Sequence, residues 1–151
     1  GGMDEVKDAE FVISLMLRMR ACVRNYKSHS DDGGKIFTIL GSLRDYETRT
    51  GRPVTVSEIA RHSGLALPNV SRLLKPLEED GYIRREKQGR TVSVIITAKG
   101  EHTLVQHRKE FISDVAEALG ALSDEERKIF LTCNEKMLAR LEKKTENLIG
   151  R

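Results

Sequence analysis

The 151-residue sequence is 38% hydrophobic and 32% charged, a composition that predicts one folded, helix-rich subunit and argues against a disordered chain or two independent domains. The net charge of +3 is unevenly distributed, because residues 51–100 carry 9 Lys and Arg against 5 Asp and Glu, whereas the thirds before and after are close to balance. A positive surplus confined to one segment indicates a surface for a polyanion, since neutralising phosphates supplies most sequence-independent affinity.

The residues argue against a membrane segment and against a disulfide framework. The most apolar early stretch, residues 11–23, contains Arg18 and Arg20 and is too short and too charged to span a bilayer. Cys22 and Cys133 are far apart in sequence and form no Cys-x-x-Cys metal spacing. We expect a cytoplasmic protein that needs no metal or other cofactor.

Helical periodicity predicts a first helix over residues 5–26 whose apolar side chains cover more than one face. Such a helix must be covered on several sides, and a partner subunit is a natural cover in so small a chain. The Asp-Asp-Gly-Gly sequence at residues 31–34 predicts a loop. A second helix follows over residues 35–48, with apolar side chains on one face at Ile36, Phe37, Leu40 and Leu43.

A short extended segment at residues 54–56 then leads into two helices joined by a turn. Thr55-Val-Ser-Glu58 matches the capping box, in which a hydroxyl and a Glu three residues later satisfy each other's backbone N–H groups. A helix over residues 57–62 is therefore expected to stop at Gly64, which tolerates the left-handed conformation. A second helix begins after Ala66 and extends to about residue 80. Its buried side is formed by Val70, Leu73, Leu74 and Leu77.

Beyond Gly81 the pattern changes to a hairpin and then to long helices. Residues 82–85 and 91–96 are predicted strands, joined by a polar, basic link over residues 86–90. Thr97 caps a long helix to about residue 119. Ser123-Asp-Glu-Glu126 is a second capping box, and it opens a last helix that runs through Leu148.

Two short helices joined by a Gly-containing turn and followed by a basic hairpin are the layout of a winged helix-turn-helix, here within residues 53–100. The 3.6-residue period turns the polar side chains of the second helix outward, where Asn69 can pair with adenine and Arg72 with guanine. The hairpin tip, led by Arg90, can enter a minor groove. The predicted DNA-binding residues are Leu67, Pro68, Asn69, Ser71, Arg72, Lys75, Lys87 and Arg90. Taken singly, these residues also fit a solvated helix face and a charged edge hairpin.

Several motifs, in this order and spacing, resemble the MarR family of bacterial and archaeal regulators. They are Val56-Ser-Glu-Ile-Ala60, Gly64-Leu65, Val70-Ser-Arg-Leu-Leu74, Leu77-Glu-Glu-Asp-Gly-Tyr-Ile83 and Thr97-Ala-Lys-Gly100. The expected fold is mainly α with a small β-hairpin wing, and the winged helix-turn-helix is flanked by N- and C-terminal dimerisation helices. Residues 1–34 and 101–151 would then form the dimerisation parts of one intertwined unit, and residues 35–100 the DNA-binding lobe.

The resemblance implies a homodimer that presents two recognition helices to a pseudo-palindromic DNA site. It also implies repression that a small aromatic or phenolic ligand relieves. Carried over by position, the family's recognition-helix readers fall on Leu67, Pro68, Asn69, Ser71 and Arg72, and its wing arginine falls on Arg90.

Three residues depart from the family pattern. Ala66 stands where the family often has a Ser that caps the recognition helix, and Gln88 stands where an acidic residue usually braces the wing. Pro76 lies well inside the recognition helix, where it removes a backbone donor and should bend the helix.

Other functions are weighed against this interpretation. Cys22 is a candidate redox sensor, because nearby arginines favour the thiolate, with Cys133 as its resolving partner; alternatively, both cysteines are small buried apolar residues. The four His residues form no i, i+4 pair, which disfavours metal sensing. The sequence has no glycine-rich phosphate loop and no nucleophile elbow, so we do not expect an enzyme. A winged helix used only for protein contacts would need an apolar or acidic outer face.

Overall fold

This computed structural model describes residues 2–27 and 35–149, leaving aside the side chains at 27, 35, 37, 63 and 147–149. The chain forms two compact units, Gly1–Thr38 and Ile39–Arg151. The loop expected at residues 31–34 lies outside the described residues, as do the side chains of Phe37 and Leu148, for which apolar contacts are expected.

The first unit contains helix α1 (Gly2–Lys27), which is longer at both ends than the predicted helix. Its apolar side chains do not form one buried stripe, since Met3, Phe11 and Met19 are 74%, 64% and 62% exposed. The other exposed large apolar side chains of α1 are Val6, Ile13, Leu15, Met16 and Leu17. The helix therefore presents apolar side chains to solvent over much of its circumference.

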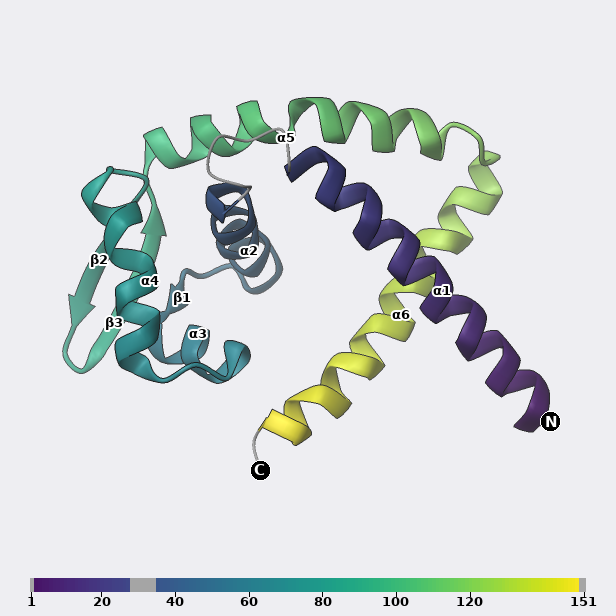
Figure 1. Cartoon of the computed structure of the whole chain (residues 1–151), viewed down its shortest axis with the longest axis horizontal. Helices are drawn as coiled ribbons and strands as arrows, with labels where there is room; N and C mark the ends of the chain where they lie inside the picture. The colour runs from purple at the N-terminus through teal and green to yellow at the C-terminus, as the bar shows by residue number, and fades with distance from the viewer. Residues whose placement is uncertain (1, 28–34, 150–151) are drawn as a thin grey trace. The chain divides into compact units, whose positions relative to one another are not determined.

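The predicted fold class, mainly α with a small sheet, is confirmed (Figure 1). After α1 the elements are α2 (Lys35–Thr50), β1 (Val54–Thr55), α3 (Val56–Ser63), α4 (Leu67–Glu79), β2 (Ile83–Gln88), β3 (Thr91–Ile96), α5 (Ala98–Leu119) and α6 (Asp124–Ile149). The strands form one antiparallel sheet in the order β1-β3-β2. The extended segment expected after α2 is thus the third strand of the wing sheet.

The hairpin differs from the prediction in the length of its first strand. The sequence predicts a polar link over residues 86–90, but β2 continues to Gln88 and leaves only Gly89 and Arg90 as the turn. Glu86, Lys87 and Gln88 each face a partner on β3, so the ladder outweighs the low strand propensity of these polar residues. Gly89 has a φ of 61°, which a two-residue hairpin turn requires and glycine adopts without strain.

The core of the second unit lies between α2, α4 and the sheet. Its most buried side chains, each at most 2% exposed, are Leu40, Val70, Leu74, Ile83 and Val94. Burying an aliphatic side chain of this size stabilises the fold by about 1.5–3 kcal/mol. Leu77 is also buried, whereas Leu73, predicted for the same side of α4, is only half-buried.

The predicted helix caps are present. The Thr55 hydroxyl accepts from the Glu58 N–H at 3.1 Å, and the Glu58 carboxylate accepts from the Thr55 N–H at 3.2 Å. Gly64 ends α3 with a φ of 73°. Thr97 caps α5 through the Gly100 N–H, and Ser123 and Glu126 form the second capping box. Each such cap is worth about 1 kcal/mol.

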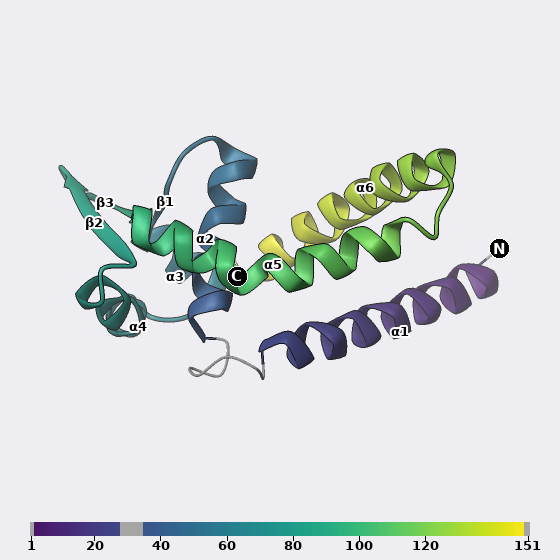
Figure 2. The ribbon, with the colours of Figure 1, turned by 90° about the horizontal axis from the view of Figure 1, so that it is seen from above.

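Helices α5 and α6 extend from the lobe that the sheet and α2–α4 form. Helix α5 begins after β3 and leads away from the sheet (Figures 1 and 2). Helix α6 begins beyond the C-terminal end of α5 and runs back from there. Arg44 of α2 pairs with Glu101 of α5, and Arg49 lies 3.9 Å from the Glu142 carboxylate of α6. These surface pairs add little stability individually.

The described part of the chain contains neither a helix suited to crossing a membrane nor a cluster of metal ligands. Within residues 2–27 and 35–149, no helix combines the length and apolarity that crossing a membrane requires. The same residues contain no group of three or more His, Cys, Asp or Glu side chains placed to hold a metal ion.

Close hydrogen-bonded packing forms a junction between the end of α4 and the start of α5. The Thr97 hydroxyl donates to the carbonyl of Gly81 at 2.5 Å, and the Thr97 N–H donates to the carbonyl of Tyr82 at 3.1 Å. The Lys99 ammonium donates to the carbonyl of Asp80 at 2.6 Å and lies 4.8 Å from the centre of the Tyr82 ring. Gly100 faces the Tyr82 carbonyl so closely that a Cβ atom would lie 2.1 Å from it.

We predict that Gly100→Ala destabilises the protein strongly. The added Cβ would meet the backbone oxygen of Tyr82 and, at 2.8 Å, the side chain of Ile96, so the junction must open. Overpacking of this kind costs about 2 kcal/mol or more, which corresponds to a fall of several degrees in Tm for a chain of this length. Thermal unfolding measured by circular dichroism tests this.

The matched control is Gly2→Ala, the same change in a helix where nothing lies within 4 Å of the added atom. We expect it to leave Tm unchanged. Equal Tm values for Gly100→Ala and the unsubstituted protein would contradict the close packing described at this junction.

Candidate nucleic-acid interface

Helix α4, the predicted recognition helix, begins without a side-chain cap. Ala66 is the N-cap residue and makes no side-chain hydrogen bond, and its carbonyl accepts from the N–H groups of Asn69 and Val70. Pro68 occupies the first turn, where its missing N–H costs nothing. The first turn therefore presents uncapped backbone to solvent at the end where α3 and α4 meet.

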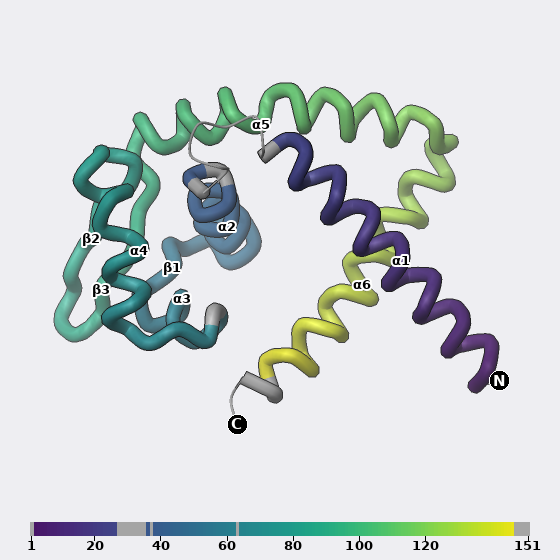
Figure 3. The backbone as a smooth tube through the Cα atoms, in the orientation of Figure 1, coloured from purple at the N-terminus to yellow at the C-terminus, as the bar shows by residue number. Residues whose placement is uncertain are grey.

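Burial sorts the side chains of α4 as the helical period predicts. Val70, Leu74 and Leu77 face the core, whereas the predicted readers are exposed, with the exception of half-buried Ser71. The exposed predicted readers on α4 are Leu67, Pro68, Asn69, Arg72 and Lys75. Figure 3 shows α4 running alongside the β2–β3 hairpin, so these side chains and the wing belong to one region of the lobe.

The basic and amide side chains on this surface are largely unengaged. The side chains of Asn69, Arg72, Lys87 and Arg90 form no hydrogen bond or ion pair with the residues that the structure describes. Lys75 makes one loose ion pair, 3.9 Å from the carboxylate of Glu79. The hydrogen-bond donors of these side chains are available for a ligand, and breaking their present contacts costs little free energy.

Ser71 is engaged differently from the other predicted readers. Its hydroxyl accepts a hydrogen bond of 2.8 Å from the Nη1 of Arg85, on strand β2. The remaining guanidinium donors of Arg85 bind the carboxylate of Glu78, with Nη2 to Oε1 at 3.0 Å, and the Arg85 backbone N–H donates to Oε2 at 3.2 Å. A single wing arginine thus holds two side chains of α4.

The Arg85 contact changes the acidity of Glu78. Side-chain hydrogen bonds from Arg85, followed by its positive charge and its backbone N–H, hold the pKa of Glu78 below its ordinary value, against an opposing effect of desolvation. About a third of the Glu78 side chain is exposed, so water screens the pair. The contact is worth far less than a buried ion pair, but it is directional.

A second polar network holds α3 in place. The Glu58 carboxylate, only 12% exposed, accepts two bonds from Arg52, at 2.8 and 3.0 Å, and one from the hydroxyl of Tyr46. The guanidinium carbon of Arg52 lies 5.5 Å from the centre of the Tyr46 ring. One capping-box residue therefore also ties α3 to α2 and to the segment between them.

The sequence did not reveal Arg85 and Glu78 as partners. They are seven residues apart and lie on a strand and a helix, so the contact exists only because β2 folds back along α4. The sequence shows Arg85 as one of four basic residues in the hairpin, and nothing in that pattern separates an arginine that faces α4 from one that faces solvent. Arg84, its neighbour, pairs only with Glu86 among the described contacts.

The two cysteines lie outside this region. Cys22 on α1 and Cys133 on α6 are both free and both exposed. The interpretation of the cysteines as buried apolar residues does not hold in the single chain, because neither side chain is buried.

The known proteins that this chain resembles contain helix-turn-helix or winged-helix domains. Residues 35–87 match the IclR helix-turn-helix domain, and residues 69–108 match the DUF6293 C-terminal winged helix domain. An HTH-type transcriptional regulator of Bacillus cereus is 30% identical over 115 residues, which make up 72% of this chain and 71% of that protein.

Two solved structures share the fold over nearly the whole chain. A MarR family protein from Bacillus stearothermophilus superposes with a TM-score of 0.74 and 19% identity, covering 94% of this chain and 98% of its own. FabT of Streptococcus pneumoniae, solved in complex with DNA, superposes with a TM-score of 0.60 and 21% identity, covering 94% and 97%.

We predict that Glu78 contributes stability that depends on pH. Because its pKa is lowered in the folded chain, the contribution is complete above the ordinary Glu pKa, near 4.5, and is lost as pH falls through the folded-state pKa. Glu78→Gln should therefore lower Tm at pH 7, by the equivalent of about 1 kcal/mol or less. The Tm gap to the unsubstituted protein should close as pH falls from 7 toward 3.

Glu79→Gln is the charge control, since it removes the adjacent carboxylate, whose described ion pair is the loose one with Lys75. The pH-dependent gap must be larger for Glu78→Gln than for this control. A gap that is constant with pH would show that the Arg85 contact does not lower the pKa of Glu78.

Proposed function

The chain belongs to the HTH-type transcriptional regulators and has the fold of the MarR family, and from this premise we propose that it reads double-stranded DNA sequence-specifically, as a homodimer. Helix α4 is the recognition helix in this proposal and the β2–β3 hairpin is the wing. The single observation that carries it is the row of exposed, largely unengaged polar side chains on α4, on the side opposite its buried apolar residues.

Base readout is assigned to the exposed side of α4. Asn69 can form two hydrogen bonds with adenine and Arg72 two with guanine, and both side chains are exposed. Leu67 and Pro68, exposed in the first turn, supply apolar contact of the kind that a thymine methyl accepts. Lys75 is placed one turn further along and suits a phosphate.

Two assignments depend on contacts in the lobe. Ser71 reaches DNA only if its hydroxyl rotates to donate while Arg85 still donates to its oxygen, because that oxygen is an acceptor in the free chain. Arg90 lies in the hairpin turn and Lys87 close to it on β2, and their positive charge suits the negative potential of a narrow minor groove.

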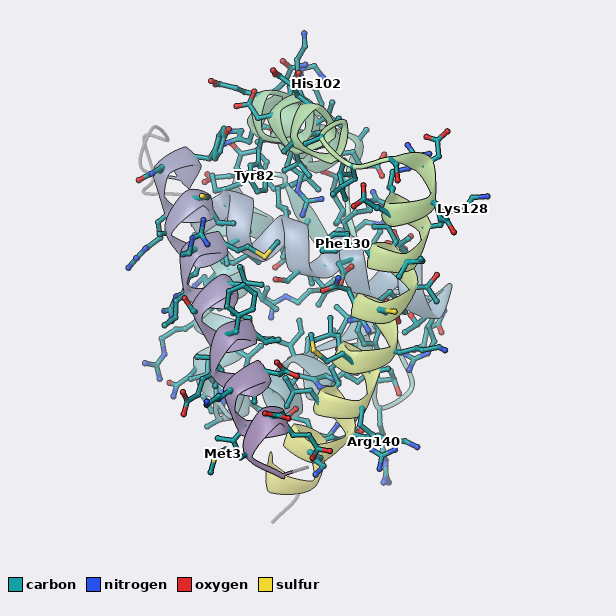
Figure 4. All side chains as sticks on the ribbon, turned by 90° about the vertical axis from the view of Figure 1, so that its right-hand side faces the viewer. Met3, Tyr82, His102, Lys128, Phe130 and Arg140 are labelled. Carbon is teal, nitrogen blue, oxygen red and sulfur yellow. The ribbon has the colours of Figure 1, made fainter. Side chains whose placement is uncertain are left out.

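Dimer formation is supported by apolar side chains outside the lobe. On α5 and α6 the exposed ones include Val105, Ile112, Val115, Ile129, Phe130, Leu131, Met137, Leu138 and Leu141, in addition to those of α1. Figure 4 shows Phe130 and Lys128 on opposite sides of α6. So large an apolar area is unusual on a monomer and fits a second copy as its cover.

The resemblance to the MarR family supports the finer parts of the proposal. Residues 1–34 and 101–151 would form the dimerisation parts and residues 35–100 the DNA-binding lobe. The regulator would act in the cytoplasm as a repressor that a small aromatic or phenolic ligand releases from DNA. A ligand of this kind would bind between the dimerisation helices and the lobe.

The experiment that tests the proposal is selection of bound duplexes from a random pool. We expect recovery of an inverted repeat with half-sites about one helical turn apart, because two recognition helices related by a two-fold axis face successive major grooves. Arg72→Ala should relax the preference at one position of each half-site, at a cost of about 1–3 kcal/mol.

The matched control is Arg127→Ala, because Arg127 is an exposed arginine on α6, 3.7 Å from the carboxylate of Asp124. This substitution should leave the selected DNA sequence unchanged. Recovery of no preferred sequence, or binding that does not weaken as salt is raised, would contradict the proposal.

Redox control through Cys22 is a second candidate, favoured by one observation: the Cys22 side chain is exposed. Three arginines, Arg18, Arg20 and Arg24, are close to it in sequence on α1. Under this candidate, peroxide oxidises Cys22 and lowers DNA affinity, and Cys22→Ser abolishes the response. The test is to measure the oxidation state of Cys22 by mass spectrometry, and the DNA affinity, before and after peroxide treatment. No change in either quantity would contradict this candidate.

A further inference from the structure

Helix α4 has a weak point just after its reading residues. Pro76 has no N–H, so the carbonyl of Arg72 lacks the donor that an i, i+4 bond would supply, although the helix continues through Pro76 to Glu79. The residues assigned to DNA readout all lie before this point, at positions 67–75. Any bending or rotation at Pro76 therefore moves the reading side chains as a group.

The part of α4 after Pro76 is held firmly by polar bonds. The Tyr82 N–H donates to the carbonyl of Leu77 at 2.9 Å, and Lys99 donates to the carbonyl of Asp80 at 2.6 Å. The part before Pro76 starts at uncapped Ala66. Val70 and Leu74 bury its inner side, but apolar burial is not directional and tolerates small rotations of a helix.

Arg85 bridges the two parts. Its Nη1 binds Ser71, five residues before Pro76, and its Nη2 and Nε bind Glu78, two residues after it. Ser71 and Glu78 are two helical turns apart and lie on the same side of α4. The planar guanidinium fixes the directions of both sets of bonds, which an ammonium could not do.

We propose that Arg85 is a positioning residue: from strand β2 it splints the recognition helix across the hydrogen bond that Pro76 removes, and so sets the angle at which α4 presents Asn69 and Arg72 to DNA. Arg85 acts through α4 and need not touch DNA. The inference deepens the proposed function, because it rests on α4 as the reading helix.

The first test uses the free protein and does not depend on DNA. Arg85→Met keeps an unbranched apolar stem and removes all the guanidinium bonds. Amide hydrogen exchange in the segment 70–75 should become about tenfold faster. Pro76→Ala restores the missing donor at an exposed position, so in the double variant Arg85→Met should accelerate exchange by no more than about twofold.

The second test measures binding to the duplex that the unsubstituted protein selects. Arg85→Met should weaken binding about tenfold, which equals about 1.4 kcal/mol, and most of the loss should disappear in the Pro76→Ala background. The slope of log affinity against log salt should not change, because a positioning residue releases no counterion, whereas loss of a phosphate contact lowers the slope by about one. Arg85→Lys keeps the charge and should still lose several-fold.

Arg84→Met is the matched control, since it removes the same charge from the neighbouring position, whose described partner is Glu86. Equal losses for Arg84→Met and Arg85→Met would overturn the inference, because net charge would then explain both. Unchanged amide exchange in Arg85→Met, or an equal effect with and without Pro76, would also overturn it. If the unsubstituted protein selects no duplex, the proposed function is wrong. The hydrogen-exchange test still shows whether Arg85 stabilises α4 across Pro76.

Discussion

The arrangement of this lobe depends on the burial of one side of α4. Val70, Leu74 and Leu77 enter the core beside Ile83 of β2, and the first two are essentially inaccessible to solvent. Because side chains on a helix keep fixed angular positions, burying these three turns the polar positions between them outward. The direction in which α4 offers its amide and guanidinium groups is therefore a consequence of apolar packing on its opposite side.

Apolar packing sets the side of α4 that faces the core, and polar bonds set its finer orientation. At the C-terminal end, Lys99 and the backbone of Tyr82 bind its last carbonyls. Along its length, Arg85 binds Ser71 and Glu78. These bonds come from the wing and from the start of α5, so the elements on either side of the recognition helix share in placing it. A change in either of them would reach the reading surface without altering any side chain on it.

The lobe and the long helices differ in how they treat apolar residues. The lobe buries its large aliphatic side chains within one chain, whereas α1, α5 and α6 leave many of theirs exposed. The hydrophobic stabilisation of the lobe therefore comes from burial within one chain. The long helices lose that stabilisation in a single chain and gain it only when another surface covers them. The proposed dimer and the proposed DNA readout would thus draw on separate sets of residues.

The sequence alone determined the features that depend on neighbours along the chain. Capping residues at Thr55, Thr97 and Ser123, the left-handed Gly64 and the apolar period of α4 predicted the order and type of the elements, because caps, turns and periodicity are local. The outward placement of Asn69 and Arg72 followed from the same period. These local signals were enough to predict the winged helix-turn-helix fold and most of the exposed side chains of its candidate surface.

Tertiary structure decided what depends on residues that meet only after folding. Pairing with β3 extended β2 to Gln88, beyond the strand that its polar side chains predict. The position of β2 beside α4 gave Ser71 and Glu78 a common partner in Arg85, and so made a predicted reader part of a structural contact. The sequence could not show this, because one basic residue in a hairpin looks like the next until the fold sets which of them faces the helix.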